Sequence, residues 1–108
     1  MKKIAIATND RETIAKRTGQ AKEFAIVELD DNMNEISRFF VENHHEHEEE
    51  EEDHNHSHAE LIESLGDIDS IYVRMVGKHL KSDLDNAGIK IVKIDNETIN
   101  SLLNDLAK

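Results

Sequence analysis

The chain has 108 residues, no cysteine and a formal net charge of -11 at pH 7, a combination that indicates one small acidic domain. An acidic surface repels polyphosphate, so nucleic acid is not expected as a partner. The lack of cysteine excludes disulfides, zinc ribbons and thiolate ligands for iron–sulfur clusters. No segment approaches the ~20 apolar residues of a membrane span, and the apolar run after Lys3 already ends at Ala7. We therefore expect a soluble, cytoplasmic protein with no membrane partner.

The acidity is concentrated in one segment, His44 to His58. This segment contains six histidines and seven acidic residues but no lysine or arginine, so the rest of the chain carries only -11 + 7 = -4. The segment has almost no apolar residues and cannot form a core, which predicts a flexible insert at 44–58 that is disordered until metal binds. The rest of the chain has an ordinary mixed surface. Residues 1–108 are predicted to form a single domain that carries this insert.

Three strands are predicted before the insert. Short apolar runs bounded by turn-forming residues indicate them, at Lys3–Thr8, Glu23–Leu29 and Asn34–Val41. After the insert, Ser57 and Glu60 form a capping-box pair, and the apolar spacing that follows predicts a helix that ends at Gly66.

The last part of the chain alternates between strands and helices. The predicted elements are a strand at Ile68–Val73, a helix at Lys78–Ala87, a strand at Lys90–Ile94 and a helix from Asn96 or Glu97 to Ala107. The order βββαβαβα indicates an α/β protein with a five-stranded mixed sheet, because three consecutive strands favour a meander and the later alternation favours parallel strands.

The predicted topology brings several strand ends together. In a meander the first and third strands point the same way, and right-handed crossovers give the fourth strand the same direction. Ligands of open α/β sheets bind beyond the carboxyl ends of such strands. The residues expected at this edge are Asn9, Asp10, Arg74, Met75, Val76 and Gly77, and the histidine segment leaves from the same edge.

Several stretches resemble one protein family. "KIAIATND", "TGQAKEFAIVELDD", "ENHH" and "IYVRMVGKHLKSDLDNAGIKIVK" are similar to the dinitrogenase iron–molybdenum cofactor biosynthesis family, and the similarity covers nearly the whole chain outside the insert. The matching positions are Gly19, Ala21, Phe24, Ile26, Val27, Gly77 and the range 87–92. The resemblance implies a three-layer α/β/α fold with a ribonuclease-H-like motif, and binding of a metal cluster or metallocofactor precursor.

The chain departs from this family at two places. Arg17 and Thr18 stand where many relatives carry His-Phe, which removes a potential cluster ligand. Arg74 and Met75 stand where relatives carry a Gly-Gly pair.

The insert is the first candidate site. Its histidines form two groups, and neutral imidazole is a ligand for Zn²⁺, Ni²⁺, Cu²⁺ and Fe²⁺, while neighbouring carboxylates add oxygen ligands. The candidate metal ligands are His44, His45, His47, His54, His56 and His58. We expect such binding to weaken as the pH falls through about 6–7, because protons compete for imidazole. The alternative is a solvated spacer with incidental metal affinity.

The second candidate site is cationic. Gly77 permits close backbone approach, and the N–H groups that start the following helix favour an anion. With the adjoining strand ends, the candidate cofactor-binding residues are Asn9, Asp10, Arg17, Gly19, Gln20, Arg74, Met75, Gly77, Lys78 and His79. The anion would be a phosphate-bearing metabolite or a negatively charged metal cluster, although each cation taken alone is better explained as a surface residue.

An enzyme is not expected. A two-metal nuclease needs carboxylates on the central strands, but "KIAIAT" and "SIYV" contain none. The sequence therefore predicts a carrier domain for a metal or metallocofactor, in which the His/Glu segment recruits divalent metal and a protein acceptor receives the cargo. The alternative is a regulatory or interaction module that binds a phosphate-bearing small molecule.

Overall fold

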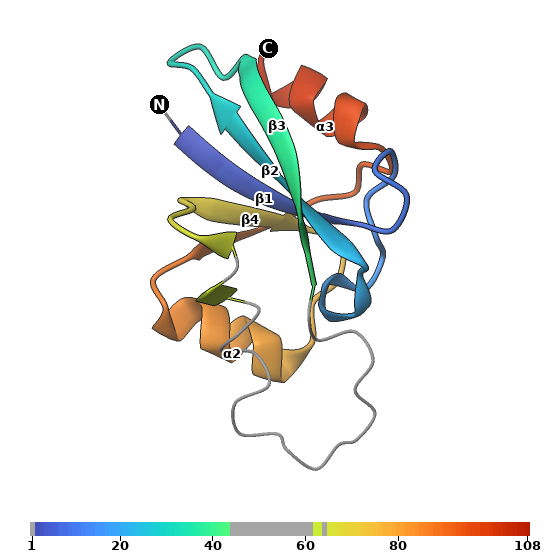
Figure 1. Cartoon of the computed structure of the whole chain (residues 1–108), viewed down its shortest axis with the longest axis vertical. Helices are drawn as coiled ribbons and strands as arrows, with labels where there is room; N and C mark the ends of the chain where they lie inside the picture. Colours follow the sequence, from blue (N-terminus) through green and yellow to red (C-terminus); the bar gives the residue numbers. More distant parts are fainter. Residues whose placement is uncertain (1, 44–61, 64) are drawn as a thin grey trace.

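One mixed sheet of five strands, in the order β3-β2-β1-β4-β5, forms the centre of the molecule (Figure 1). The structure is a computed structural model that describes residues 2–43, 62–63 and 65–108. The elements are β1 (Lys2–Thr8), the 3-10 helix η1 (Thr18–Gln20), β2 (Glu23–Leu29), β3 (Glu35–Glu42), β4 (Ser70–Val73), α2 (Lys78–Asn86), β5 (Lys90–Lys93) and α3 (Ile99–Leu106).

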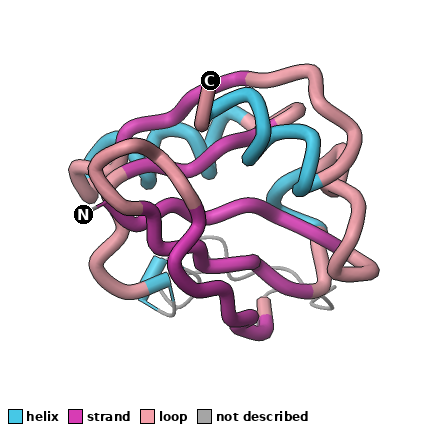
Figure 2. The backbone as a smooth tube through the Cα atoms, turned by 90° about the horizontal axis from the view of Figure 1, so that it is seen from above, coloured by secondary structure: helices cyan, strands magenta, loops and turns pink. Residues whose placement is uncertain are grey.

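The strand directions confirm the predicted mixed sheet. β2 pairs antiparallel with both β1 and β3, whereas β4 pairs parallel with both β1 and β5. The carboxyl ends of β1, β3, β4 and β5 therefore lie at the same end of the sheet. Figure 2 shows the twist of these strands from above. We call the loops at this end the rim, meaning residues 9–22, Asn43 and residues 74–79.

The strands β1, β2 and β4 are buried on both faces, which explains the apolar runs of β1 and β2. On β1, Ala5 and Ala7 belong to the core cluster on the α2 side, which also contains Leu80 and Leu84. Ile4 and Ile6 belong to the cluster on the α3 side, with Ile99, Leu102 and Leu103. The alternation along β1 thus places one helix on each face, and Figure 1 shows α3 above the strands and α2 below them. The three-layer α/β/α architecture is confirmed.

Several predicted boundaries were wrong by one to three residues. β4 begins at Ser70 and not at Ile68, and just before it Asp69 N–H donates to the Lys3 carbonyl of β1 at 2.7 Å. The last helix begins at Ile99, because Thr98 caps it by accepting a hydrogen bond from Ser101 N–H. The other shifts, at the starts of β1 and β3 and at the ends of β3, α2, β5 and α3, are of one residue.

Part of the chain lies outside the described residues. The predicted helix that follows Ser57 is helical at Ile62, Glu63 and Leu65, and its other residues are not described. The insert at 44–58, with its six candidate histidine ligands and its predicted disorder, is also outside the described part. Among the helices that are described, none is long and apolar enough to cross a membrane.

Candidate functional site

A buried asparagine connects the rim loops. Asn43, which directly follows β3, has 0% exposure, and its side-chain amide donates to the carbonyls of Ala21 at 2.7 Å and Gly19 at 3.2 Å. Its backbone N–H donates to the Lys22 carbonyl at 2.9 Å. A buried amide with two carbonyl acceptors fixes the geometry of the segment that it bonds. Asn43 therefore holds η1 and the residues after it against the end of β3.

The other end of η1 is bonded to the loop that follows β4. Thr18 is buried, and both its hydroxyl and its backbone N–H donate to the Met75 carbonyl, at 2.9 Å and 3.1 Å. η1 also lies close to α2, because a Cβ placed on Gly19 would be 3.5 Å from Leu80 Cδ2. The loops after β3 and β4 are thus fixed to one 3-10 turn.

Asn9 adds the loop that follows β1. Its side-chain oxygen accepts a hydrogen bond from Lys22 N–H at 2.9 Å, and Lys22 is the residue whose carbonyl bonds Asn43. A chain of hydrogen bonds therefore runs from β1 through Asn9, Lys22, Asn43, η1 and Met75 to β4. The rim is one connected surface, as the strand directions predicted.

Asp10 organises the next turn. Its Oδ1 accepts hydrogen bonds from the backbone N–H groups of Thr13 at 2.8 Å and Glu12 at 2.9 Å, and from the Thr13 hydroxyl at 2.9 Å. The hydrogen bonds from Thr13 and Glu12 hold the pKa of Asp10 below its ordinary value, because they stabilise the carboxylate. Asp10 is therefore an anion that is already engaged within its own loop.

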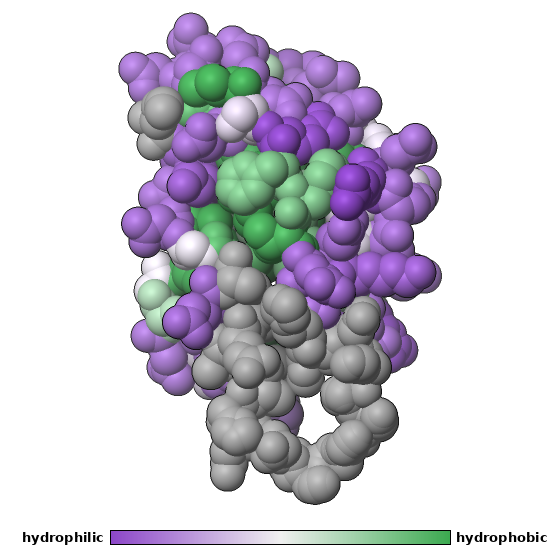
Figure 3. Space-filling model, viewed as in Figure 1, coloured by the Kyte–Doolittle hydropathy of each residue, from purple (hydrophilic) through white to green (hydrophobic). Residues whose placement is uncertain are grey.

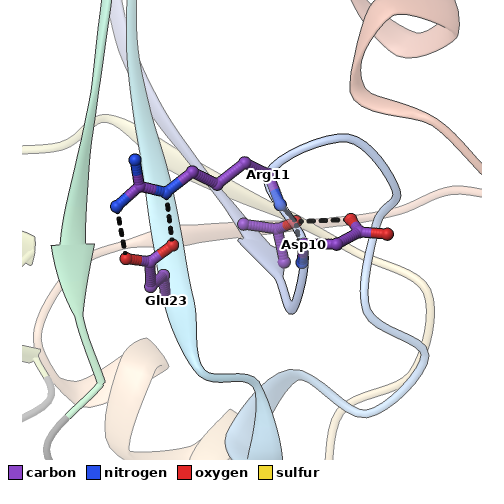
Figure 4. Close-up of polar contacts among 4 residues, drawn as sticks. Asp10, Arg11 and Glu23 are labelled. Atoms are coloured by element: carbon purple, nitrogen blue, oxygen red, sulfur yellow. Dashed lines mark hydrogen bonds and ion pairs between the residues drawn. The ribbon is translucent and has the colours of Figure 1, made fainter.

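Arg11 reaches from the loop after β1 over Glu23, the first residue of β2, towards Phe40 of β3. It adopts a φ of 68°, which a non-glycine residue rarely does, and its guanidinium bonds both carboxylate oxygens of Glu23 at 2.8 Å (Figure 4). The same group lies 4.6 Å from the centre of the Phe40 ring. The hydrogen bond from Arg11 lowers the pKa of Glu23. This bidentate pair is structural, because both charges are already matched.

The cationic part of the rim surrounds the start of α2. Arg17, Lys78 and His79 are exposed and Arg74 is half-buried. Gly77 is the N-cap residue, and within the described part of the chain no side chain caps it and the first turn contains no acidic residue. The first N–H groups of α2 and the nearby cations therefore favour a bound anion.

Comparison with known proteins identifies the chain. The family described as dinitrogenase iron-molybdenum cofactor matches over residues 1–108. The chain belongs to this family. No curated protein matches it.

Three solved structures have the same fold as this chain. The orange protein of Desulfovibrio gigas, in its apo form, is similar with a TM-score of 0.73 at 17% identity, over 96% of this chain and 85% of that one. A candidate NifB protein from Thermotoga has a TM-score of 0.72 at 16% identity, over 99% of this chain and 88% of that one. A candidate dinitrogenase from Methanocaldococcus jannaschii has a TM-score of 0.69 at 16% identity, over 94% of this chain and 83% of that one. At such identities the likeness concerns the fold.

The described residues of this dinitrogenase iron–molybdenum cofactor family member do not by themselves form a metal site. Among them, no group of three or more His, Cys, Asp or Glu side chains could hold a metal ion. The described rim thus fits an anion through N–H groups and cations.

The structure places every described candidate residue on or beside the rim. Asn9, Gly19 and the Met75 backbone belong to the hydrogen-bonded chain, while Gln20 and the cations are on its surface. Sequence reasoning missed Thr18 and Asn43, which hold the loops together. Asn43 stands in the stretch "ENHH" that resembles the family, so its signal was present but no role could be assigned to it.

Proposed function

We propose that this protein carries a metal-containing anionic cofactor, which it binds at the rim and passes to a protein acceptor. Membership of the dinitrogenase iron–molybdenum cofactor family supports the cofactor class. The cations and the uncapped first turn of α2 support the negative charge of the cargo. A carrier is favoured over a catalyst because the central strands β1 and β4 carry no carboxylate side chain.

One observation supports a joint action of the two candidate sites. Asn43 is bonded to Gly19 and Ala21, and His44 is the next residue in the chain. The described chain that precedes the histidine-rich segment therefore ends beside η1, within the rim. We propose that the imidazoles of this segment recruit a divalent metal ion of the Zn²⁺, Ni²⁺, Cu²⁺ or Fe²⁺ type, or supply ligands to the metal of the cargo.

The proposal is tested with two probes, Zn²⁺ for the insert and molybdate as a simple anion for the rim. Isothermal titration would compare the wild type, a deletion of residues 46–55, and Arg74→Glu. Lys90→Glu is the control, because Lys90 is exposed at the amino end of β5, away from the rim. We expect the deletion to weaken Zn²⁺ binding, Arg74→Glu to weaken molybdate binding at least tenfold, and the control to change neither.

The coupling of the two sites has its own readout. If the insert and the rim act together, the deletion also weakens uptake of molybdate in the presence of Zn²⁺. Unchanged molybdate uptake in the deletion variant would contradict joint action, and unchanged binding in Arg74→Glu would remove the rim from the proposal.

A phosphate-bearing small molecule is the second candidate cargo. The same uncapped first turn of α2 and the same cations would bind a phosphate group. In that case the insert is a spacer. Inorganic phosphate would then compete with molybdate for wild-type protein, and the deletion would affect neither anion.

A further inference from the structure

The two edges of the sheet differ strongly. β5 has only four residues, and exposed lysines stand at both of its ends, Lys90 and Lys93. Short, lysine-bearing edges prevent strand pairing between molecules. β3, the other edge, has eight residues and no proline. Among the described residues no strand pairs with its outer side, which therefore offers a long row of backbone donors and acceptors.

β3 also carries exposed apolar side chains. Among the described residues, the exposed large hydrophobic side chains are Ile36 at 52%, Phe39 at 48% and Met75 at 49%, and the first two belong to β3. Figure 3 shows an apolar area in the middle of the face on which β3 lies in front, with hydrophilic residues above it and to its right. Such a patch beside an open strand edge is typical of an interaction surface.

The sequence of β3 is complementary to itself. The stretch from Arg38 to Glu42 reads Arg-Phe-Phe-Val-Glu. When a second copy runs antiparallel with Phe40 facing Phe40, Phe39 faces Val41 and Arg38 faces Glu42, and both of these pairs occur twice. Aromatic and opposite-charge pairs are the cross-strand contacts that stabilise antiparallel strands. A two-fold axis requires this kind of self-matching surface.

We propose that two copies of this chain associate through their β3 strands, antiparallel about a two-fold axis at Phe40, to form one continuous ten-stranded sheet. This interface is independent of the cofactor-carrier function. In this register both Arg38–Glu42 pairs form, and every apolar residue from Phe39 to Val41 faces an apolar residue of the other strand. The partner is therefore a second copy of the chain.

The side chains in this register lie on matching faces. Phe39 pairs with Ile26 and Val41 with Phe24 within the chain, so both belong to the α2 face. Phe40 packs in the cluster on the α3 face. The Phe39–Val41 contacts would thus form on the α2 face, and the Phe40–Phe40 contact on the α3 face.

Arg38 can serve both its own chain and the second copy. Within the chain it uses Nε and Nη2, which bond Glu35 at 2.6 Å and 3.0 Å, and Nη2 also bonds Asn100 Oδ1 at 3.2 Å. Nη1 carries two further donors. In the proposed register these donors would bond Glu42 of the second copy.

The association is expected to be weak. A single pair of edge strands buries less than the roughly 1,200–2,000 Å² of a stable interface, and each copy has a net charge of -11. We expect a dissociation constant on the order of 100 µM, which calls for sedimentation equilibrium over about 10 µM to 1 mM protein at about 0.15 M salt.

Charge reversal tests the register. Glu42→Arg places arginine opposite arginine, and Arg38→Glu places glutamate opposite glutamate, so each variant alone should dimerise at least tenfold more weakly than the wild type. A one-to-one mixture of the two restores both opposite-charge pairs and should dimerise again. A monomeric wild type at 1 mM, or a mixture no better than its components, would overturn the proposal.

Cross-linking tests the axis without charge changes. The chain has no cysteine, so a single introduced cysteine reports one position. In this register the two Phe40→Cys sulfurs face each other across paired strands, whereas the two Ile36→Cys sulfurs are about 27 Å apart. Under mild oxidation only Phe40→Cys should form a covalent dimer rapidly. Equal rates for both variants would contradict the register.

Discussion

Replacing Asn43 should destabilise the protein strongly, because its buried amide makes two hydrogen bonds that nothing else can replace. Asn43→Ala removes the donors to Gly19 and Ala21. Each hydrogen bond contributes a net ~1 kcal/mol, and leaving a buried carbonyl unpaired raises the cost to about 1–3 kcal/mol. The free energy of unfolding should therefore fall by about 2–4 kcal/mol, a large part of the ~5–15 kcal/mol of a typical domain.

Urea denaturation followed by circular dichroism measures this loss, as a lower midpoint with an unchanged slope. Asn43→Asp keeps the shape but faces the two carbonyls with a carboxylate, so at neutral pH it should cost at least as much as Asn43→Ala. That cost should shrink at acidic pH, where the protonated carboxyl donates again. Asn104→Ala, at an exposed position of α3, is the control and should change stability by less than ~0.5 kcal/mol. A similarly small loss for Asn43→Ala would refute the assigned role.

Three further changes test the local structure. Thr18→Val removes the hydroxyl bond to the Met75 carbonyl but retains the backbone bond, so we expect a loss of ~1 kcal/mol in urea denaturation and weaker molybdate binding by titration. Gly88→Ala should cost ~1 kcal/mol in the same assay, because Gly88 has a φ of 81° after α2. Asp10→Asn should make stability less dependent on pH, measured as the urea midpoint from pH 6 to 2.5. The folded-state pKa of Asp10 is lowered, so its contribution is complete above about pH 4 and is lost as the pH falls below that; an unchanged pH profile would argue against these hydrogen bonds.

The strands of the core could be predicted from the sequence because their signals are local. β2 was predicted with its observed bounds, Glu23–Leu29, since its apolar run is bounded by polar residues at both ends. The position of β1 at the centre follows from the same logic, because a strand buried on both faces is apolar throughout. The mixed topology followed from the order of the elements alone.

The contacts that assemble the rim could not be predicted in the same way. η1 is a short turn whose bonds go to residues distant in sequence, Met75 and Asn43. In the sequence, Asn43 is a polar residue next to the insert and gives no sign of burial, although it has 0% exposure in the fold. Its burial depends on how η1 packs against the end of β3, and no local pattern records that packing.

Cofactor binding at the rim and dimerisation through β3 should be independent of each other, for a geometric reason. In an antiparallel pair of β3 strands, the carboxyl ends of the two copies point in opposite directions. The rim lies at the carboxyl ends of β1, β3 and β4, and Asn43 is three residues past the axis at Phe40. The two rims of a dimer would therefore lie on opposite sides of the axis, roughly 20 Å apart along the strands, and would face in opposite directions.

Independence has a measurable consequence. A ligand that binds monomer and dimer equally well cannot shift the association equilibrium, and dimerisation cannot change the affinity for that ligand. Titrations of molybdate at about 10 µM and about 500 µM protein, on either side of the expected dimer dissociation constant, should give the same affinity and one site per chain. An affinity that rises with protein concentration would show instead that the dimer interface and the rim are coupled, and that the two rims are not separated as the antiparallel register requires.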